Sequence, residues 1–186
     1  MKRIRSVVQA SAREFNLEYA SLMAFIEVES SGQGFGKDGR LIIQFEPFWF
    51  IKLTPNPPFT KWSKNGVEGQ SREWGAFEDA CLIDKRAAME STSIGLGQIL
   101  GLHWRRLGYT SVQEMWDDAM KGIERQVWQI CKFIDTDRRL RTALDRKDWH
   151  IVASIYNGAG YKKLAEKLGR EPYNISLEKA YRRYSV

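Results

Sequence analysis

The sequence has little histidine and little cysteine, with two residues of each among 186. Cys81 and Cys131 lie far apart, in segments with the pattern of amphipathic helices, so we expect buried free thiols. His103 and His150 are isolated, and no spacing typical of metal ligands includes either residue type. The sequence therefore predicts no metal site, and we expect no cofactor.

Long apolar runs are also absent. The N-terminal residues 1–15, MKRIRSVVQASAREF, are charged and lack the continuous apolar stretch of a secretory signal. No segment approaches the roughly 20 apolar residues of a membrane span. We therefore expect a soluble protein that is made in the cytoplasm and reaches an external target only after release or export.

The length and the charge limit the possible partners. A chain of 186 residues, 43% hydrophobic and 12% aromatic, fits one globular domain, and we expect a monomer. The net charge is +6, and residues 160–186 hold seven basic and three acidic side chains. Such a basic end favours a polyanion, but the basic residues fall all around the helical turns, so a solvated face is the alternative and no nucleic-acid partner is expected.

The most informative stretch runs from Leu22 to Glu46. Leu22, Phe25, Ile26 and Glu29 have the spacing of one helical face, which is apolar except at Glu29. The residues that follow, 30–32, predict the end of the helix, because Gly accepts the left-handed conformation common at C-caps. A carboxyl at the end of an apolar stripe loses hydration, so its pKa should rise and it could serve as a general acid. The alternative for Glu29 is a solvated side chain at a fraying helix end.

A strand ending in a second carboxyl is predicted next. The turn signal at residues 37–39 leads into the β-rich run 41–46, which we interpret as one arm of a small hairpin that Glu46 closes. Glu46 could face the first carboxyl. The alternative is an ordinary charge at a strand end, paired with Arg40 or Lys52.

The middle of the chain lacks clear periodicity. Residues 54–75 predict a long loop, because the prolines from 55 to 58 forbid regular structure, and its Trp and Gly residues favour a cleft wall. A helix is predicted at about 76–89. Residues 90–101 then place three glycines and three hydroxyls around Gln98. Such small residues serve either close approach to a ligand or a Gly-rich helix crossing in the core.

Helical patterns dominate the remainder. A first helix is predicted at 3–15, packed on the helix that ends in Glu29. Ser111 and Glu114 form a capping box, and an apolar stripe follows at positions 123, 127, 130 and 134. Asp148 caps a helix that ends in Tyr156-Asn157, and further helices are predicted near 160–168 and 176–184. The fold class is α+β, predominantly α, with a small β hairpin between helices.

Three motifs in this order carry a resemblance to a known family: Glu29-Ser30-Ser31-Gly32, Gly95-Leu96-Gly97-Gln98 and Tyr156-Asn157-Gly158. The ordered set resembles the lysozyme-like superfamily, which includes goose-type lysozymes and lytic transglycosylases. The whole chain is more closely similar to the N-acetylmuramidase domain of phage endolysins. The further matches are Gly34-Phe35, Asp38-Gly39-Arg40, Phe45-Glu46, Ser91 to Ser93 and Gly95 to Gly101.

The resemblance implies a single lysozyme-like domain over residues 1–186, without a separate wall-binding module. It implies that Glu29 is the catalytic acid and that Glu46 and Thr54 complete the catalytic site. Residues expected to hold the substrate are Ser93, Gln98, Tyr156 and Asn157. The chain departs from the family pattern in having Pro47-Phe48 where Arg-His is common and Ile94 where Trp is common.

The implied activity is hydrolysis of the β-1,4 bond between N-acetylmuramic acid and N-acetylglucosamine in peptidoglycan. Glycan strands would be the partner, together with anionic envelope polymers bound by the basic C-terminal end. The enzyme would act on the cell wall after release from the host cytoplasm. Two alternatives are a lytic transglycosylase, in which Glu46 is dispensable, and a non-catalytic wall-binding or phage structural module.

Overall fold

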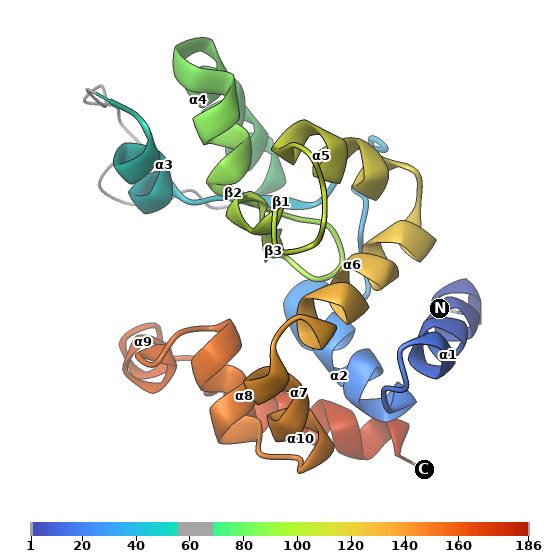
Figure 1. Cartoon of the computed structure of the whole chain (residues 1–186). Coiled ribbons are helices and arrows are strands. Elements are labelled where there is room, and N and C mark those ends of the chain that lie inside the picture. The colour runs from blue at the N-terminus through green and yellow to red at the C-terminus, as the bar shows by residue number, and fades with distance from the viewer. Residues whose placement is uncertain (1, 56–68, 186) are drawn as a thin grey trace. The chain divides into compact units, whose positions relative to one another are not determined.

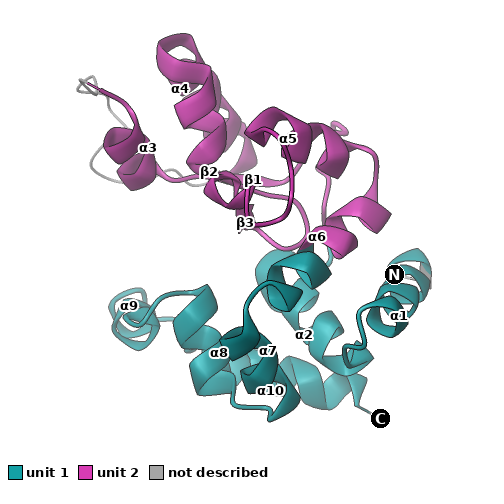
Figure 2. Cartoon of the chain, viewed as in Figure 1, with its two compact units in different colours: residues 1–32, 130–186 teal, residues 33–129 magenta. Residues whose placement is uncertain are grey.

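The computed structural model describes residues 2–55 and 69–185 (Figure 1). It divides the chain into two compact units, Met1–Gly32 with Ile130–Val186 and Gln33–Gln129, shown in different colours in Figure 2. We call them the helical unit and the sheet unit; the boundary between residues 129 and 130 falls within helix α6 (Ile123–Asp135). Most of the described chain is helical and one small antiparallel sheet is present, which confirms the predicted fold class.

The helical unit is built around helix α2 (Tyr19–Ser30). Its remaining helices are α1 (Lys2–Glu14), α7 (Arg138–Asp145), α8 (Trp149–Tyr156), α9 (Tyr161–Lys167), α10 (Tyr173–Tyr184) and the end of α6. Both α1 and α10 pack against α2, as predicted for α1. All seven residues from Ala20 to Ile26 are buried, so the helix is enclosed around its whole circumference rather than along one stripe.

Local signals explain where these helices begin and end. Ser31 adopts the left-handed conformation (φ 52°) and its N–H bonds to the Glu27 carbonyl at 2.9 Å, so α2 ends where predicted, with Ser31 as well as Gly32 at positive φ. The Asp148 side chain accepts a bond from Ile151 N at 3.0 Å, which confirms the predicted cap of α8. Helix α7 was not predicted, although Asp137 caps it in the same way.

The sheet unit holds three short strands in the order β1 (Ile43–Phe45), β2 (Thr92–Ile94) and β3 (Ile99–Leu100). The predicted hairpin before Glu46 is reduced to one bridge between Phe35 and Leu41. Strand β1 pairs instead with β2, in the register Ile43 to Ile94 and Phe45 to Thr92. A two-stranded hairpin this short is marginal in water, so the strand depends on a distant partner.

The Gly-rich stretch is a β hairpin, so the alternative of a Gly-rich helix crossing is wrong. Gly95 (φ 67°) and Gln98 (φ 46°) form the turn between β2 and β3. A Cβ on Gly101 would lie 2.0 Å from the Met89 carbonyl oxygen, so only glycine fits where η1 (Gly101–His103) follows the sheet. The glycines thus serve close backbone approach.

Two helices replace parts of the chain that were predicted as irregular. Helix α3 (Pro47–Leu53) begins with Pro at its first position, a favoured place that the prediction of a turn overlooked. Helix α4 (Gln70–Glu90) starts six residues earlier than predicted and is kinked at Asp84. The predicted loop is therefore wrong over 70–75, while its residues 56–68, including Trp62 and Gly66, lie outside the described residues.

The first turns of α4 bind β1 on the side that β2 leaves unpaired. The Gln70 amide bonds to both N (3.0 Å) and O (2.8 Å) of Ile43, Glu73 Oε2 accepts from Phe45 N (2.7 Å), and Trp74 Nε1 donates to Leu41 O (3.2 Å). Three side chains at i, i+3 and i+4 therefore meet alternate residues of the strand. They satisfy backbone groups that another strand would otherwise pair with.

The remaining helices of the sheet unit follow the predicted patterns. Ser111 Oγ accepts from Glu114 N at 3.1 Å at the start of α5 (Val112–Met120), which confirms this half of the capping box. The Glu114 carboxylate accepts from Thr110 N at 2.7 Å rather than from Ser111 N.

Among the described helices, none combines the length and apolarity needed to cross a bilayer.

Candidate active site

Glu29 lies in the last turn of α2, where its side chain is half-buried. Burial raises the pKa of this carboxyl to about 7, and a hydrogen bond donated by the Tyr173 hydroxyl to Oε1 opposes that rise. The position differs from that of a solvated side chain at a fraying end. Near neutral pH the group is therefore divided between its protonated and ionised forms.

Tyr173, the first residue of α10, is the partner of Glu29 that the sequence prediction missed. Burial and the neighbouring Glu29 and Tyr156 raise its pKa well above the ordinary value, so the phenol stays protonated and can donate. The predicted start of this helix, at residue 176, excluded Tyr173. The signal that could have placed it is Pro172, since a helix often begins at or just after a proline.

Tyr156 and Asn157 end helix α8 in the same unit. The Tyr156 ring packs edge-on against Phe25 of α2, with ring centroids 4.5 Å apart, and against Phe133 of α6 at 5.3 Å. Asn157 is exposed and its N–H closes the helix on the Ala153 carbonyl at 2.9 Å. The helical unit therefore brings Tyr156 to the helix that carries Glu29, with Asn157 directly after it.

Glu46 lies in the sheet unit between β1 and α3. Its N–H donates to the Ser91 carbonyl (2.9 Å) and its own carbonyl accepts from Trp49 N (3.0 Å), so the backbone is fixed on both sides. Burial of its half-exposed side chain raises the pKa of the carboxyl.

Neither of the predicted partners, Arg40 or Lys52, forms a salt bridge with Glu46. Arg40 bonds to Asp38 (2.7 Å) and Glu78 (3.3 Å), and the Lys52 ammonium lies 4.2 Å from the Phe48 ring centre. Within the part of the chain that the structure describes, no salt bridge holds the Glu46 carboxylate. A carboxylate left in this state is a stronger base than one neutralised by a cation.

Thr54 caps the other end of α3, so one short helix carries both Glu46 and Thr54 at its ends. The Thr54 side chain is buried, with 6% of its surface exposed, yet Oγ1 has no hydrogen-bond partner among the described residues. Buried hydroxyls are nearly always paired, with protein or with ordered water. Thr54 therefore offers a hydroxyl that is ready to bind a water or a ligand.

Ser93 and Gln98 belong to the β2–β3 hairpin. Ser93 is nearly buried at the centre of β2, opposite Gln44 and Leu100. Gln98 Nε2 donates to Gly95 O (2.8 Å) and to Ile42 O (3.3 Å), so this amide holds the hairpin turn to the segment before β1. Of the predicted site residues, Ser93 thus lies in the small sheet, Glu46 directly follows β1, and Gln98 lies in the turn between β2 and β3.

Gln126 of α6 also holds that hairpin, and the sequence analysis did not single it out. Its Oε1 accepts from Leu96 N at 2.9 Å and its Nε2 donates to Ala119 O at 3.0 Å. A Cβ on Gly34 would lie 2.1 Å from Gln126 Oε1, which explains why glycine stands there. Two residues of the matched motifs, Gly34 and Leu96, are therefore tied to one buried amide.

Metal ligands are the remaining question about the chemistry. Within residues 2–55 and 69–185, no group of three or more His, Cys, Asp or Glu side chains could hold a metal ion. Partial burial and the charge of Arg106 lower the pKa of His103 to about 4.

The fold and these carboxyls define a class of protein. A predominantly helical domain with a small antiparallel sheet and a half-buried, helix-terminal Glu is the arrangement of the lysozyme-like glycosidases, whose chemistry uses carboxyl groups. Residues 18–185 match the family model of the N-acetylmuramidases. The chain belongs to this family, and it is therefore a peptidoglycan hydrolase of the glycosidase type.

A solved structure supports the same assignment. The crystal structure of the Burkholderia AP3 phage endolysin matches with a TM-score of 0.79 and 32% sequence identity, over 97% of this chain and 70% of that one. No curated protein matches the sequence.

Proposed function

We propose that the protein is an endolysin that hydrolyses the β-1,4 bond between N-acetylmuramic acid and N-acetylglucosamine, with Glu29 as general acid. The observation that carries the proposal is the carboxyl of Glu29, whose pKa burial raises to about 7 and whose Oε1 the Tyr173 hydroxyl holds. Release from the host cytoplasm would bring the enzyme to the cell wall.

Glu29 gives its proton to the glycosidic oxygen as the bond to the sugar breaks. Tyr173 occupies Oε1 as a donor, so the proton resides on the other carboxyl oxygen, which can then face the substrate. The sugar ring develops positive charge as an oxocarbenium-like transition state forms. Proton transfer of this kind contributes about 10²–10⁴-fold to a rate.

Glu46 and Thr54 serve the water that completes hydrolysis. Glu46 removes a proton from this water, or stabilises the positive charge on the sugar, because its carboxylate has no salt bridge among the described residues. Thr54 Oγ1 orients the water, since this buried hydroxyl has no protein partner in the described chain. The ends of α3 hold both groups in place.

Four residues would hold the sugar substituents. Asn157 and Tyr156 present polar groups from the end of α8, beside the helix of the proposed acid. Gln98 and Ser93 contribute through the hairpin, where the Gln98 amide nitrogen already fixes the turn. These two residues thus shape the sheet that carries Glu46 as well as contacting acetamido and hydroxyl groups.

The basic C-terminal end would keep the enzyme on an anionic envelope. Three of its seven basic side chains are paired with carboxylates, namely Lys179 with Glu171, Arg182 with Glu178 and Arg183 with Glu27. The other four, the exposed Lys162, Lys163 and Lys167 of α9 and the exposed Arg170 that follows this helix, are therefore the ones that would contact a polyanion.

Purified sacculi provide the test. The expected result is loss of turbidity together with soluble fragments whose mass includes one added water per cleaved bond and whose new ends are reducing. Anhydro-muramyl ends would show a lytic transglycosylase and overturn the hydrolase proposal. Binding to sacculi with no loss of turbidity would identify a non-catalytic wall-binding module.

A further inference from the structure

The sheet unit holds a cavity that the proposed mechanism does not use. Its volume is about 510 Å³, and it lies where the last turns of α4 meet η1 and the start of α5 (Figure 1). None of the proposed catalytic or sugar-binding residues lines it. The residues that do so come from three segments, namely Lys85, Arg86 and Met89 of α4, Trp104 and Arg105 after η1, and residues 110–113.

We propose that this cavity is a binding site for a phosphate group carried by a sugar, either a free sugar phosphate or a phosphorylated polymer of the cell envelope. The site requires neither Glu29 nor Glu46, so it goes beyond the proposed function and does not depend on which bond the enzyme cuts.

Positive charge is the first feature that points to an anion. Lys85, Arg86 and Arg105 line the cavity with exposed side chains, and among the described residues no acidic side chain lines it. Neither Lys85 nor Arg105 forms a salt bridge within the described chain. Cations that share a cavity repel one another, and an anion placed among them removes this cost.

Two of the three cations are held in place by one buried acid. Glu90, with 8% of its surface exposed, accepts at Oε1 from Arg86 Nε (3.0 Å) and from Trp104 Nε1 (2.8 Å). The guanidinium carbon of Arg105 in turn lies 4.5 Å from the centre of the Trp104 ring. Glu90 offsets one positive charge and leaves the cavity positive. Because it fixes both guanidinium groups before a ligand arrives, less entropy is lost on binding.

The hydrogen-bond donors that remain match a phosphate. Among the described residues, Arg86 is bonded through Nε alone, so its two terminal nitrogens are left to donate. Stacking engages the face of the Arg105 guanidinium and leaves the N–H groups in its plane. Ser111 Oγ accepts from Glu114 N, and no described group accepts its hydrogen. Guanidinium groups bind phosphate through two parallel hydrogen bonds, and three cations suit a dianion better than a carboxylate.

The other lining residues suit the organic body that carries the phosphate. Met89, Trp104 and Val112 provide apolar contacts, whereas Thr110 and Gln113 are exposed polar residues. A volume of about 510 Å³ lies in the range of small-molecule sites, which combine an apolar wall with a few polar groups. A sugar has both C–H faces and hydroxyls, so it fits this mixed wall.

The test is an NMR titration with glucose 6-phosphate, followed at the indole N–H signal of Trp104. The expected result is a saturable shift in the wild type. Arg105→Gln and Lys85→Gln, both at exposed positions, should each raise the Kd by about 10-fold, the value of one charge-assisted hydrogen bond. The absence of a saturable shift in the wild type, or an unchanged Kd in both variants, would overturn the proposal.

Two further ligands test the two parts of the probe. Inorganic phosphate should bind more weakly than glucose 6-phosphate, and glucose should not bind. Equal affinity for inorganic phosphate would overturn the assignment to a sugar, and equal affinity for glucose would overturn the recognition of phosphate. Displacement of the probe by a phosphorylated envelope polysaccharide, but not by the same material after phosphatase treatment, would identify a polymer as the source. No displacement would identify a free sugar phosphate.

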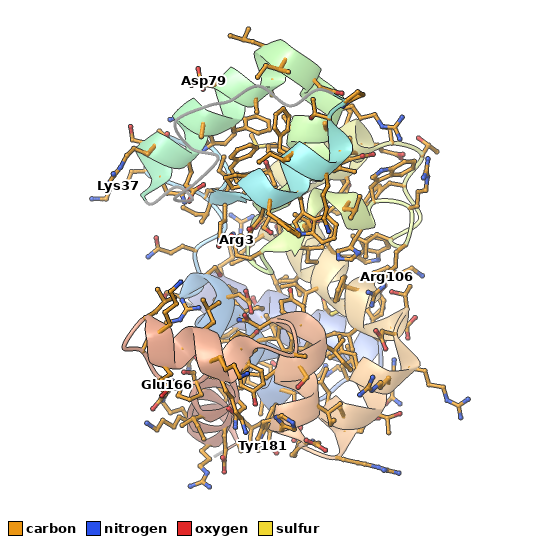
Figure 3. All side chains as sticks on the ribbon, turned by 90° about the vertical axis from the view of Figure 1, so that its left-hand side faces the viewer. Arg3, Lys37, Asp79, Arg106, Glu166 and Tyr181 are labelled. Atoms are coloured by element: carbon orange, nitrogen blue, oxygen red, sulfur yellow. The ribbon has the colours of Figure 1, made fainter. Side chains whose placement is uncertain are left out.

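Lys37→Gln is the matched control for Lys85→Gln. Lys37 is an exposed lysine of the same unit, and Figure 3 shows it on the side opposite Arg106, the residue that follows Arg105. Its replacement removes one positive charge without changing the cavity, so the Kd should equal that of the wild type. An equal loss of affinity in Lys37→Gln and Lys85→Gln would show attraction by net charge alone and would overturn the site.

Discussion

The two units each hold one proposed catalytic carboxyl, and they treat it differently. In the helical unit, Glu29 is desolvated but receives a hydrogen bond from a neutral phenol, which limits the rise of its pKa to about 7. In the sheet unit, Glu46 is desolvated beside a second acid, Glu73. The first environment suits a group that must hold a proton and release it. In the second, no salt bridge among the described residues neutralises the Glu46 carboxylate.

The largest effect is expected for Glu29→Gln. The amide keeps the acceptor for Tyr173 but has no proton to give, so kcat/KM on sacculi should fall by about 10³-fold, within the range for general acid catalysis. Loss of turbidity at fixed enzyme concentration measures this. Glu27→Gln on the same helix is the control, because Glu27 pairs with Arg183 and takes no part in the proposed chemistry.

Stability should change in the opposite direction in the same variant. The folded-state pKa of Glu29 is raised from 4.5 to about 7, so the folded state binds the proton more tightly than the unfolded one and stability falls as pH rises through this window. Gln at position 29 removes that loss. The Tm of Glu29→Gln should therefore exceed that of the wild type at pH 8 and equal it at pH 4; a lower Tm at pH 8 would contradict the buried environment.

Glu46→Gln should have the next largest effect, a fall in kcat/KM of about 10²-fold, the lower end of the range for acid–base catalysis. The reason is that water must then attack without a base. Product analysis at long reaction times should still show added water. A wild-type rate in this variant would contradict a catalytic role for Glu46. It would favour the mechanism of a transglycosylase, which uses one carboxyl.

Tyr173→Phe tests how the helical unit sets the pKa of Glu29. Loss of the donor removes the effect that lowers the pKa of Glu29, so the basic limb of the pH–rate profile, expected near pH 7 in the wild type, should move to higher pH. The rate at the optimum should fall by about 2- to 10-fold, the value of one hydrogen bond. Tyr181→Phe, which removes a bond from the same helix to Glu18, should leave the profile unchanged.

The smallest effect is expected for Thr54→Val, and here activity and stability again diverge. The hydroxyl has no partner among the described residues, so its removal should raise stability by up to about 1 kcal/mol. Activity should fall several-fold because the water loses its orientation. Thr92→Val is the comparison: Thr92 Oγ1 donates to Ala88 O at 2.8 Å, so this change should cost about 1 kcal/mol. A destabilised Thr54→Val would contradict a free hydroxyl.

The sequence predicted the helical unit better than the sheet unit, for a physical reason. The stripe that ends in Glu29, the Asp148 cap and the apolar face of α6 are local patterns, and a helix is stabilised by neighbours three and four residues apart. The Tyr173 contact joins residues far apart in the chain, so no local period could reveal it.

The environment of Glu46 depends on segments that the sequence does not bring together. Strand β1 pairs with β2, and the first turns of α4 cover its other side, although residues 70–75 look like loop because Gly75 interrupts the helical pattern. Glu73 therefore had no predicted place. The strand pattern singled out Glu46 and the family resemblance added Thr54, whereas their separation by one short helix emerged from the structure.

The side-chain hydrogen bonds from α4 to β1 also affect whether molecules of this protein associate with one another. A strand with unpaired backbone groups along one edge is a template for a strand of another molecule, and such pairing leads to aggregation. Gln70, Glu73 and Trp74 occupy these groups at Leu41, Ile43 and Phe45, so this edge is closed to strand addition. An enzyme that accumulates to high concentration can thus keep a three-stranded sheet without joining it to its neighbours along β1.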